Sequence, residues 1–69
     1  MATVKQALRE NDVVELVDSI GRWPAGRLGA VVSDYGDVKL VEITDEEGVM
    51  LDLIQVDEPR LKLISRHSA

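Results

Sequence analysis

The sequence predicts a single all-β domain. Short runs rich in valine, isoleucine and leucine recur along the 69 residues, and turns rich in glycine, aspartate and proline separate them. The helix-tolerant stretch at residues 5–10 is too short to be stable alone. A chain of this length buries a thin core, so we expect its stability to come from efficient closure of the sheet or from oligomerisation.

The N-terminal part predicts a leader, a strand and a long loop. Residues 1–11 form a helical or irregular leader in this prediction, and Leu8 is the residue expected to dock it on the domain. Residues 12–18 form the first strand, and their apolar side chains fall on both faces, which predicts that both faces are covered. Residues 19–29 carry three glycines and a proline, which indicates a long loop.

Four further strands are expected after this loop. They cover residues 30–35, 38–44, 49–56 and 61–64. In the second of these, the apolar residues change face after Leu40. This change predicts a β-bulge of the kind that a small barrel needs in order to close.

The turns between these strands complete the predicted fold. Residues 45–48 fit a type I turn followed by a left-handed glycine. Residues 57–60 fit a capped 3₁₀ turn with Pro59 at its first position, and residues 65–69 read as a polar tail. This order of elements is that of a five-stranded SH3-like barrel, which we expect to span residues 12–64.

Several short motifs resemble a known family. They are DVVEL at residues 12–16, LGAVV at 28–32, VEI at 41–43, DEEG at 45–48 and LKLI at 61–64. Over most of the chain they are similar to the Domain of Unknown Function 4926 family, small bacterial proteins with a pattern close to DVV-L, G-x-VV, VEF, D-x-x-G and L-x-x-L. The chain departs from that pattern in the Arg22-Trp23-Pro24 loop and at Ala30, where a threonine is more usual. The resemblance implies an SH3-like barrel and supplies no functional residue, while family members encoded beside toxin-like genes suggest an antitoxin or immunity role.

Composition and charge argue against several classes of protein. The chain has no cysteine, which rules out disulfides and thiolate metal sites and favours the cytoplasm. Its first residues lack an apolar signal core, and no run is long enough to span a bilayer. The formal net charge of −5 argues against non-specific DNA or RNA binding. We therefore expect a cytoplasmic protein with no membrane association and no cofactor, and no small-molecule substrate is indicated.

The charges are distributed unevenly along the chain. Residues 34–58 contain nine acidic residues and one basic residue, Lys39. Residues 19–33 contain two arginines and no acidic residue. One loop is therefore locally basic on an otherwise acidic domain.

The sequence lacks a catalytic group with the support that catalysis requires. The single histidine, His67, lies in the polar tail, and there is no cysteine to act as a nucleophile. Asp45, Glu46 and Glu47 lie on an expected hairpin turn where nothing desolvates them, and their spacing is not that of a calcium loop. We therefore predict that the protein is not an enzyme.

Asp52 lies in the middle of an expected strand, on the face that also carries Met50 and Ile54. In one interpretation its side chain points outward from a locally apolar surface. In the alternative it marks an interface and pairs with an arginine of another chain, namely Arg22, Arg27 or Arg60.

The long loop is the best candidate for a binding site. An exposed Trp23 beside Arg22 is typical of a protein–protein hot spot. The only aromatic residues are Trp23 and Tyr35, which argues against a groove for proline-rich segments. Arg22, Trp23 and Arg27 combine basic and aromatic side chains, as a nucleic-acid-binding surface does, but the rest of the chain is acidic and would repel a nucleic acid. Trp23 either folds back to cap one open end of the barrel or is presented to a partner.

The functional prediction is a non-enzymatic module that binds a protein partner or a second copy of itself. It uses the loop at residues 22–27 or an apolar sheet face around Met50 and Ile54. The candidate partner-binding residues are Arg22, Trp23, Arg27, Tyr35, Met50, Asp52 and Ile54. Two alternatives stay open: an acidic, antitoxin-like inhibitor of a basic partner acting through residues 34–58, and weak nucleic-acid binding through the Arg-Trp loop.

Overall fold

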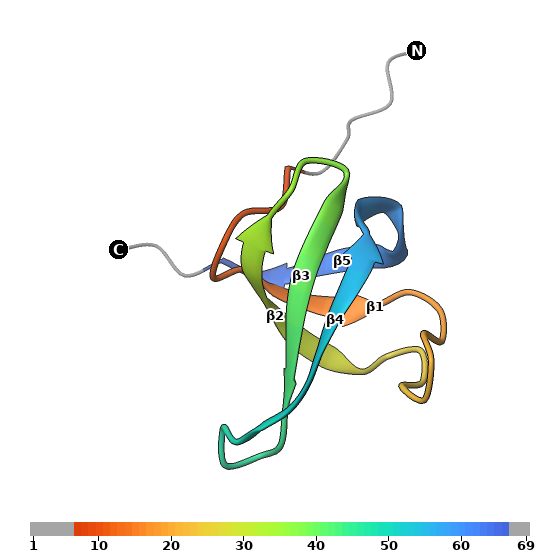
Figure 1. Cartoon of the computed structure of the whole chain (residues 1–69), viewed down its shortest axis with the longest axis vertical. Helices are drawn as coiled ribbons and strands as arrows, with labels where there is room; N and C mark the ends of the chain where they lie inside the picture. Colours follow the sequence, from red (N-terminus) through yellow and green to blue (C-terminus); the bar gives the residue numbers. More distant parts are fainter. Residues whose placement is uncertain (1–6, 67–69) are drawn as a thin grey trace.

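The computed structural model describes residues 7–66 and confirms the prediction of an all-β chain. Five antiparallel strands and one 3₁₀ turn follow one another along the described residues (Figure 1). Their bounds are β1 Val13–Leu16, β2 Leu28–Asp34, β3 Val38–Thr44, β4 Met50–Asp57, η1 Glu58–Arg60 and β5 Leu61–Ser65. Each expected strand is present, with its ends shifted by no more than two residues.

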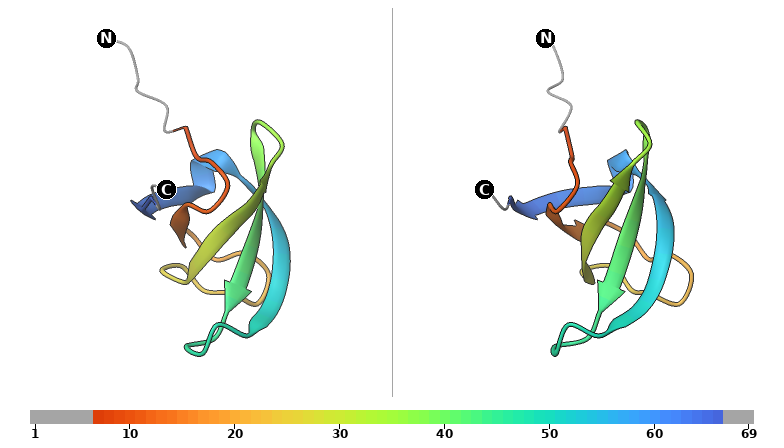
Figure 2. Two further views of the ribbon diagram at one scale, coloured as in Figure 1. Left: turned by 90° about the vertical axis from the view of Figure 1, so that its left-hand side faces the viewer. Right: turned by 60° about the vertical axis from the view of Figure 1, so that its left-hand side comes forward.

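The strands form one sheet in the order β4-β3-β2-β1-β5. The sheet is strongly bent, so that β1 and β5 run at a steep angle to β3 and β4 (Figures 1 and 2). The closed barrel of the sequence prediction is wrong, because β4 and β5 form no ladder with each other in the described part of the chain. The turn η1 redirects the chain after β4, and β5 then pairs with β1 instead.

The described part of the leader is an irregular turn. It contains no helix, so the helical form of the prediction is not seen there. A carboxylate oxygen of Asp12 accepts the backbone N–H of Arg9 at 2.8 Å, and Asn11 has a φ of 74°, which interrupts any helix. Leu8 is 2% exposed and belongs to the core, as predicted for the docking residue. The other leader positions, residues 1–6, lie outside the described residues.

One face of the bent sheet holds the core. Its buried apolar side chains are Leu8, Val14, Leu16, Val31, Val41, Ile43, Val56 and Leu61. Along β3, buried and half-buried residues alternate without a break, and Lys39 occupies an inward position. The apolar residues of β3 do change face after Leu40, from the outer to the inner face, but β3 itself keeps its alternation because the buried Lys39 fills the preceding inward place. The predicted bulge is present opposite this step, but its extra residue lies in β2, where the register shifts between Val31 and Ser33, and not in β3.

Three smaller predictions have different outcomes. The outer face of β1 is not fully covered, since Val13 is half-buried and Val17 is 56% exposed. The turn between β3 and β4 is confirmed: the N–H of Gly48 donates to the carbonyl oxygen of Asp45 at 3.1 Å, and Gly48 has a φ of 85°. The 3₁₀ turn is also confirmed, but it starts at Glu58, so Pro59 is its second and not its first residue, and the Asp57 side chain forms no capping hydrogen bond.

Gly29 allows the sheet to bend sharply over its own core. It lies on the inner face of β2, opposite Val14 of β1. A Cβ atom at this position would lie 2.6 Å from Cγ1 of Val41 and 3.0 Å from the backbone oxygen of Glu42. These separations are shorter than atoms tolerate, so the close approach of β3 to β2 requires a residue without a side chain.

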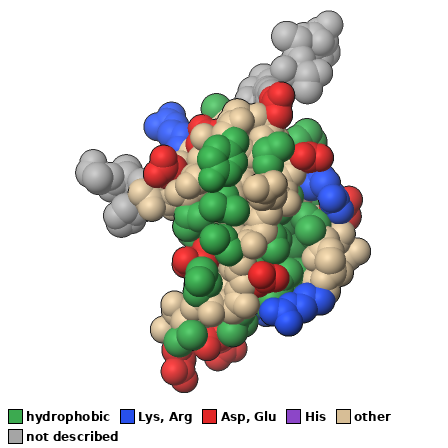
Figure 3. Space-filling view, viewed as in Figure 1, with side chains coloured by type: hydrophobic (Ala, Val, Ile, Leu, Met, Phe, Trp, Pro, Cys, Tyr) green, Lys and Arg blue, Asp and Glu red, His purple; other side chains and the backbone are tan. Residues whose placement is uncertain are grey.

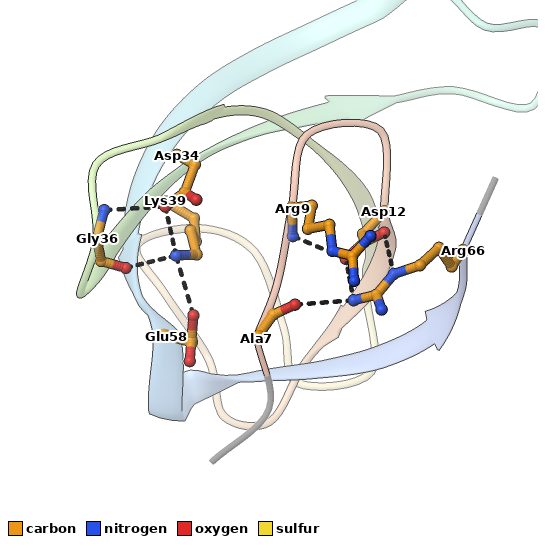
Figure 4. A network of polar contacts seen from close by, with 8 residues as sticks. All are labelled: Ala7, Arg9, Asp12, Asp34, Gly36, Lys39, Glu58 and Arg66. Carbon is orange, nitrogen blue, oxygen red and sulfur yellow. Dashed lines mark hydrogen bonds and ion pairs between the residues drawn. The ribbon is translucent and has the colours of Figure 1, made fainter. Parts of the chain in front are cut away.

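A buried ion-pair network joins the β2–β3 turn to η1 (Figure 4). The Lys39 side chain is 3% exposed, and its Nζ lies 2.6 Å from Oδ1 of Asp34 and 2.9 Å from Oε2 of Glu58. Lys39 also donates to the carbonyl oxygen of Gly36. Burial lowers the pKa of Lys39, but the hydrogen bonds to the two carboxylates outweigh this effect and raise the pKa above its ordinary value. Lys39 is therefore charged, and its contacts with Asp34, Gly36 and Glu58 fix the position of its side chain.

A second network ties together the two ends of the described chain (Figure 4). Asp12 is 1% exposed and accepts hydrogen bonds from two nitrogens of Arg66, at 3.0 and 2.9 Å. Arg66 also donates to the carbonyl oxygen of Ala7 at 2.8 Å. The hydrogen bond from Arg66 lowers the pKa of the Asp12 carboxyl, although burial alone would raise it. The predicted polar tail is thus wrong at its start, because Ser65 ends β5 and Arg66 belongs to the fold.

Replacing Lys39 by methionine should destabilise the domain by roughly 3 kcal/mol, because Glu58 would be buried without its partner. The double variant Lys39→Met/Glu58→Gln should recover part of this loss, since it removes the uncompensated charge. Urea unfolding followed by circular dichroism measures both variants. Equal free energies of unfolding for wild type and the single variant would contradict a stabilising role of the buried pair.

The Asp12–Arg66 pair predicts a pH dependence of stability. Because the carboxyl pKa is lower in the folded than in the unfolded chain, ionised Asp12 stabilises the fold above its ordinary pKa of 3.8. This contribution is lost as the pH falls through the lower folded value. Wild type should therefore be more stable than Asp12→Asn at neutral pH, and the difference should shrink below pH 3.8. Thermal unfolding over a series of pH values measures it, and a difference independent of pH would count against the pair.

Candidate functional site

The loop between β1 and β2 folds back and places Trp23 against the edge of the core. Ile20 and Trp23 form a bridge in which each backbone N–H donates to the other residue's carbonyl oxygen at 2.9 Å. Gly21, with a φ of 57°, makes this tight turn possible. The side chains of Ile20 and Trp23 are half-buried and pack against the core. Of the two positions expected for Trp23, the observed one is that of a cap on the core.

Trp23 is hydrogen-bonded to Asp52 of β4. Its Nε1–H donates to Oδ2 of Asp52 at 2.8 Å. Asp52 lies opposite Ile43, on the inner face of the sheet, so the outward position expected from the sequence is wrong. The hydrogen bond from Trp23 lowers the pKa of the Asp52 carboxyl, and the backbone N–H of Leu53 and the charge of Arg22 lower it further. The loop thus binds β4 through an ionised carboxylate.

Two arginines lie over the indole ring of Trp23. The guanidinium carbons of Arg22 and Arg27 are 4.7 and 5.0 Å from the ring centre, which is within cation–π range. Arg27 also donates to the carbonyl oxygen of Thr44, at the end of β3, at 2.8 Å. We call Arg22, Trp23, Arg27 and Asp52 the Trp23 cluster. Its arginines are held by contacts within the chain.

The Trp23 cluster covers part of the edge of β4. A strand at the edge of a sheet leaves one row of backbone N–H and C=O groups without a neighbouring strand. Here Arg22 donates to the carbonyl oxygen of Leu51 at 3.5 Å, and Oδ1 of Asp52 accepts the N–H of Leu53 at 2.9 Å. Side chains therefore occupy two backbone positions that another strand would otherwise use.

The structure brings five of the predicted site residues together and separates two. Beside the Trp23 cluster, Ile54 is half-buried at the next inward position of β4 after Asp52. Met50 is 55% exposed at the start of β4. Tyr35 is 60% exposed in the β2–β3 turn, at the other end of β3 from the β3–β4 turn (Figure 1). The sequence prediction for His67 lies outside the described residues.

An exposed apolar row on the outer face of the sheet was not among the predicted site residues. Leu51 and Leu53 of β4 are 42% and 46% exposed, and they point away from the core. Leu40 of β3 is half-buried and lies diagonally next to Leu53 on the same face. Figure 3 shows apolar side chains along this face, with acidic side chains gathered at the end formed by the β3–β4 turn. The alternation of β4 was visible in the sequence, but which of its two apolar faces is covered was not.

Beside the cluster, a shallow groove of about 470 Å³ lies between the start of β2 and the β3–β4 turn, lined by Arg27, Leu28, Asp45 and Glu46 among others. Within residues 7–66 no buried side-chain nitrogen or oxygen lacks a hydrogen-bond partner. In that range no group of three or more His, Asp or Glu side chains is placed to hold a metal ion. Nor does the described chain contain a helix with the length and apolar character needed to cross a membrane.

Comparisons with protein-family models, with curated proteins and with solved structures found no match for this chain. Fold and site therefore define a structural class: an open, five-stranded antiparallel β domain whose β4 edge is covered in part by a tryptophan cluster. The resemblance to the Domain of Unknown Function 4926 family stays a prediction that the short motifs alone carry.

Trp23 is the single tryptophan of the chain, so its fluorescence reports on the cluster. Because the hydrogen bond lowers the pKa of Asp52, Trp23 emission should change with a midpoint below pH 3.8 as the carboxylate is protonated. Asp52→Asn should remove this transition. Circular dichroism on the same samples separates it from unfolding. A transition of the same size and midpoint in the variant would show that another group causes it.

Proposed function

We propose that this chain is a protein-interaction module that binds a basic partner through the outer face of β3 and β4. The observation that carries the proposal is the apolar row formed by the exposed Leu51 and Leu53 and the half-buried Leu40. Burying such surface against a partner is favourable by about 25 cal/mol per Å² of apolar area. Contiguous exposed apolar patches with a polar border are typical of protein–protein contact sites.

Acidic side chains border this row. Glu42 lies opposite Leu53 on the neighbouring strand, Asp57 ends β4, and the β3–β4 turn adds three more acidic residues. Lys39, the one basic residue among residues 34–58, is 3% exposed and paired with two carboxylates. It therefore does not offset the surface charge. Complementarity of charge favours a partner rich in lysine and arginine.

The contacts within the Trp23 cluster favour the outer face of β3 and β4, rather than the loop, as the binding site. A nucleic-acid site needs free aromatic faces on which bases can stack, and two guanidinium groups already lie over Trp23. Self-association through the outer face would bring together two chains that each carry a net charge of −5. A basic protein partner, as for an acidic inhibitor of a basic protein, agrees better with these charges.

Leu53→Lys tests the proposal, and Ile64→Lys is its matched control. The two side chains are 46% and 44% exposed, and both changes add one positive charge. Ile64 lies on β5, at the other edge of the sheet. The probe is a short synthetic peptide of leucine and lysine, compared with a peptide of leucine and glutamate in the same order. In fluorescence anisotropy we expect only the lysine peptide to bind, with binding weakened about tenfold by Leu53→Lys and little by Ile64→Lys.

Raising the salt concentration should weaken this binding, because the acidic border acts through exposed charges. Equal binding of the two peptides would show that charge does not select the partner. An equal loss in the two variants would show that the outer face of β4 is not the site.

A further inference from the structure

The open part of the β4 edge begins where the Trp23 cluster ends. β4 is an outermost strand of the sheet, and the cluster bonds to its backbone at Leu51 and Leu53. Gln55 and Asp57 follow at the next alternate positions, and both are exposed. Within residues 7–66, Gln55 has no hydrogen bond or ion pair outside the β3–β4 ladder. A short stretch of edge is therefore available to another strand.

The register of the sheet shows which way the backbone groups of this stretch point. The carbonyl oxygen of Val38 accepts a hydrogen bond within the β2–β3 turn, so the backbone of Val38 faces β2 rather than β4. Val38 stands opposite Asp57, and alternate residues of an antiparallel pair share one orientation. Asp57, Gln55 and Leu53 therefore direct their N–H and C=O groups away from β3. The bond from the Leu53 N–H to the Asp52 side chain agrees with this orientation.

The two sides of this edge differ in chemistry. On the inner side, Ile54 and Trp23 are half-buried and pack against the core. On the outer side, Leu53 is 46% exposed, Asp57 is exposed, and Glu42 lies on the neighbouring strand. The side chains of an added strand would alternate between these two sides. One set would meet the apolar groups of Ile54 and Trp23, and the other set would meet Leu53 and the acidic groups around it.

We propose that the partner binds here as an added β-strand, an extended segment of alternating apolar and basic residues that pairs with β4 between Leu53 and Asp57. The basic side chains lie on the outer side, where their aliphatic stems cover Leu53 and their charged ends reach Asp57 and Glu42, and the apolar side chains lie on the inner side near Ile54. Backbone hydrogen bonds supply affinity in this mode, and the alternating side chains supply specificity. The inference rests on the proposed function, because it specifies how the basic partner is held.

A second copy of this chain fits the edge less well than a basic segment does. Antiparallel pairing of two β4 strands around Gln55 would place Leu53 of each copy opposite Asp57 of the other. It would also join two chains with a net charge of −5 each. Because Arg22 and Asp52 occupy the backbone groups at the start of β4, such pairing could not extend past Leu53.

Gln55→Pro tests strand addition, and Gln55→Ala is its matched control. The Gln55 N–H points away from β3, so proline removes a donor to the added strand without removing a bond of the β3–β4 ladder. The probe is a short peptide in which valine and lysine alternate, compared with a peptide of the same composition whose valines follow helical spacing. We expect the alternating peptide to bind at least about tenfold more tightly in fluorescence anisotropy. Gln55→Pro should lose that advantage, and Gln55→Ala should keep it.

Amide hydrogen exchange followed by NMR gives a second readout on the wild-type chain, independent of whether the proline variant folds. The alternating peptide should slow exchange at Gln55 and Asp57, whose N–H groups face the edge. Exchange at Ile54 and Val56, whose N–H groups face β3, should change little. Analytical ultracentrifugation of the same samples reports whether a second copy is bound.

Equal binding of the two valine–lysine peptides, with unchanged exchange at Gln55 and Asp57, would overturn strand addition. If lysine peptides still bind and Leu53→Lys still weakens them, the proposed function stands and the mode of binding is wrong. If no lysine peptide binds the wild-type chain, both proposals fail. A chain that dimerises, protects Gln55 and excludes the peptide would assign the edge to a second copy.

Discussion

The buried ion pair between Lys39 and Glu58 holds an open sheet together where no backbone ladder does so. β4 and β5 are the two outer strands, and η1 carries the chain from one to the other. The contact of 2.9 Å between Nζ of Lys39 and the Glu58 carboxylate fixes η1 against the β2–β3 turn. Because η1 determines where β5 starts, this contact and the backbone hydrogen bond from the Glu58 N–H to the carbonyl oxygen of Asp37, at 2.8 Å, together set how β5 reaches β1. A buried lysine is tolerated only when its charge is matched, and Asp34 supplies the second carboxylate.

The Trp23 cluster acts at the start of β4, where the Lys39 network does not reach. Trp23 spans from the β1–β2 loop to Asp52, a separation of 29 residues in sequence, and brings Arg22 to the backbone of Leu51. The contacts of the Trp23 cluster thus cover the core and also occupy part of the β4 edge, which would otherwise be free to pair with another strand. The length of β4 that remains open is a consequence of where this loop is anchored.

Local patterns could be predicted from the sequence, and contacts between distant residues could not. The strands and the Asp45–Gly48 turn follow from alternation and glycine placement, so they were found within two residues. The bulge expected after Leu40 was assigned to the wrong strand, because the pattern of β3 alone does not show that Lys39 is buried against Glu58 of another element. Barrel closure failed for a similar reason, since the pairing of outer strands depends on the turn between them. Trp23 was recognised as a candidate, but its bond to Asp52 required the fold.

The charge pattern has a different meaning once the basic residues are placed. In the sequence, Lys39 and the arginines of the long loop oppose the acidic segment. In the structure, Lys39 is buried, Arg27 is bonded to the end of β3, and Arg22 lies beside Asp52 and the Trp23 ring. Arg22 is 69% exposed but pairs with Asp52, and Lys39 pairs with Asp34 and Glu58, so neither forms an ion pair with Glu42 or Asp57 beside the exposed leucines. The preference for a basic partner therefore follows from the arrangement of the charges and not from their sum, and the nearby open edge offers that partner backbone groups as well.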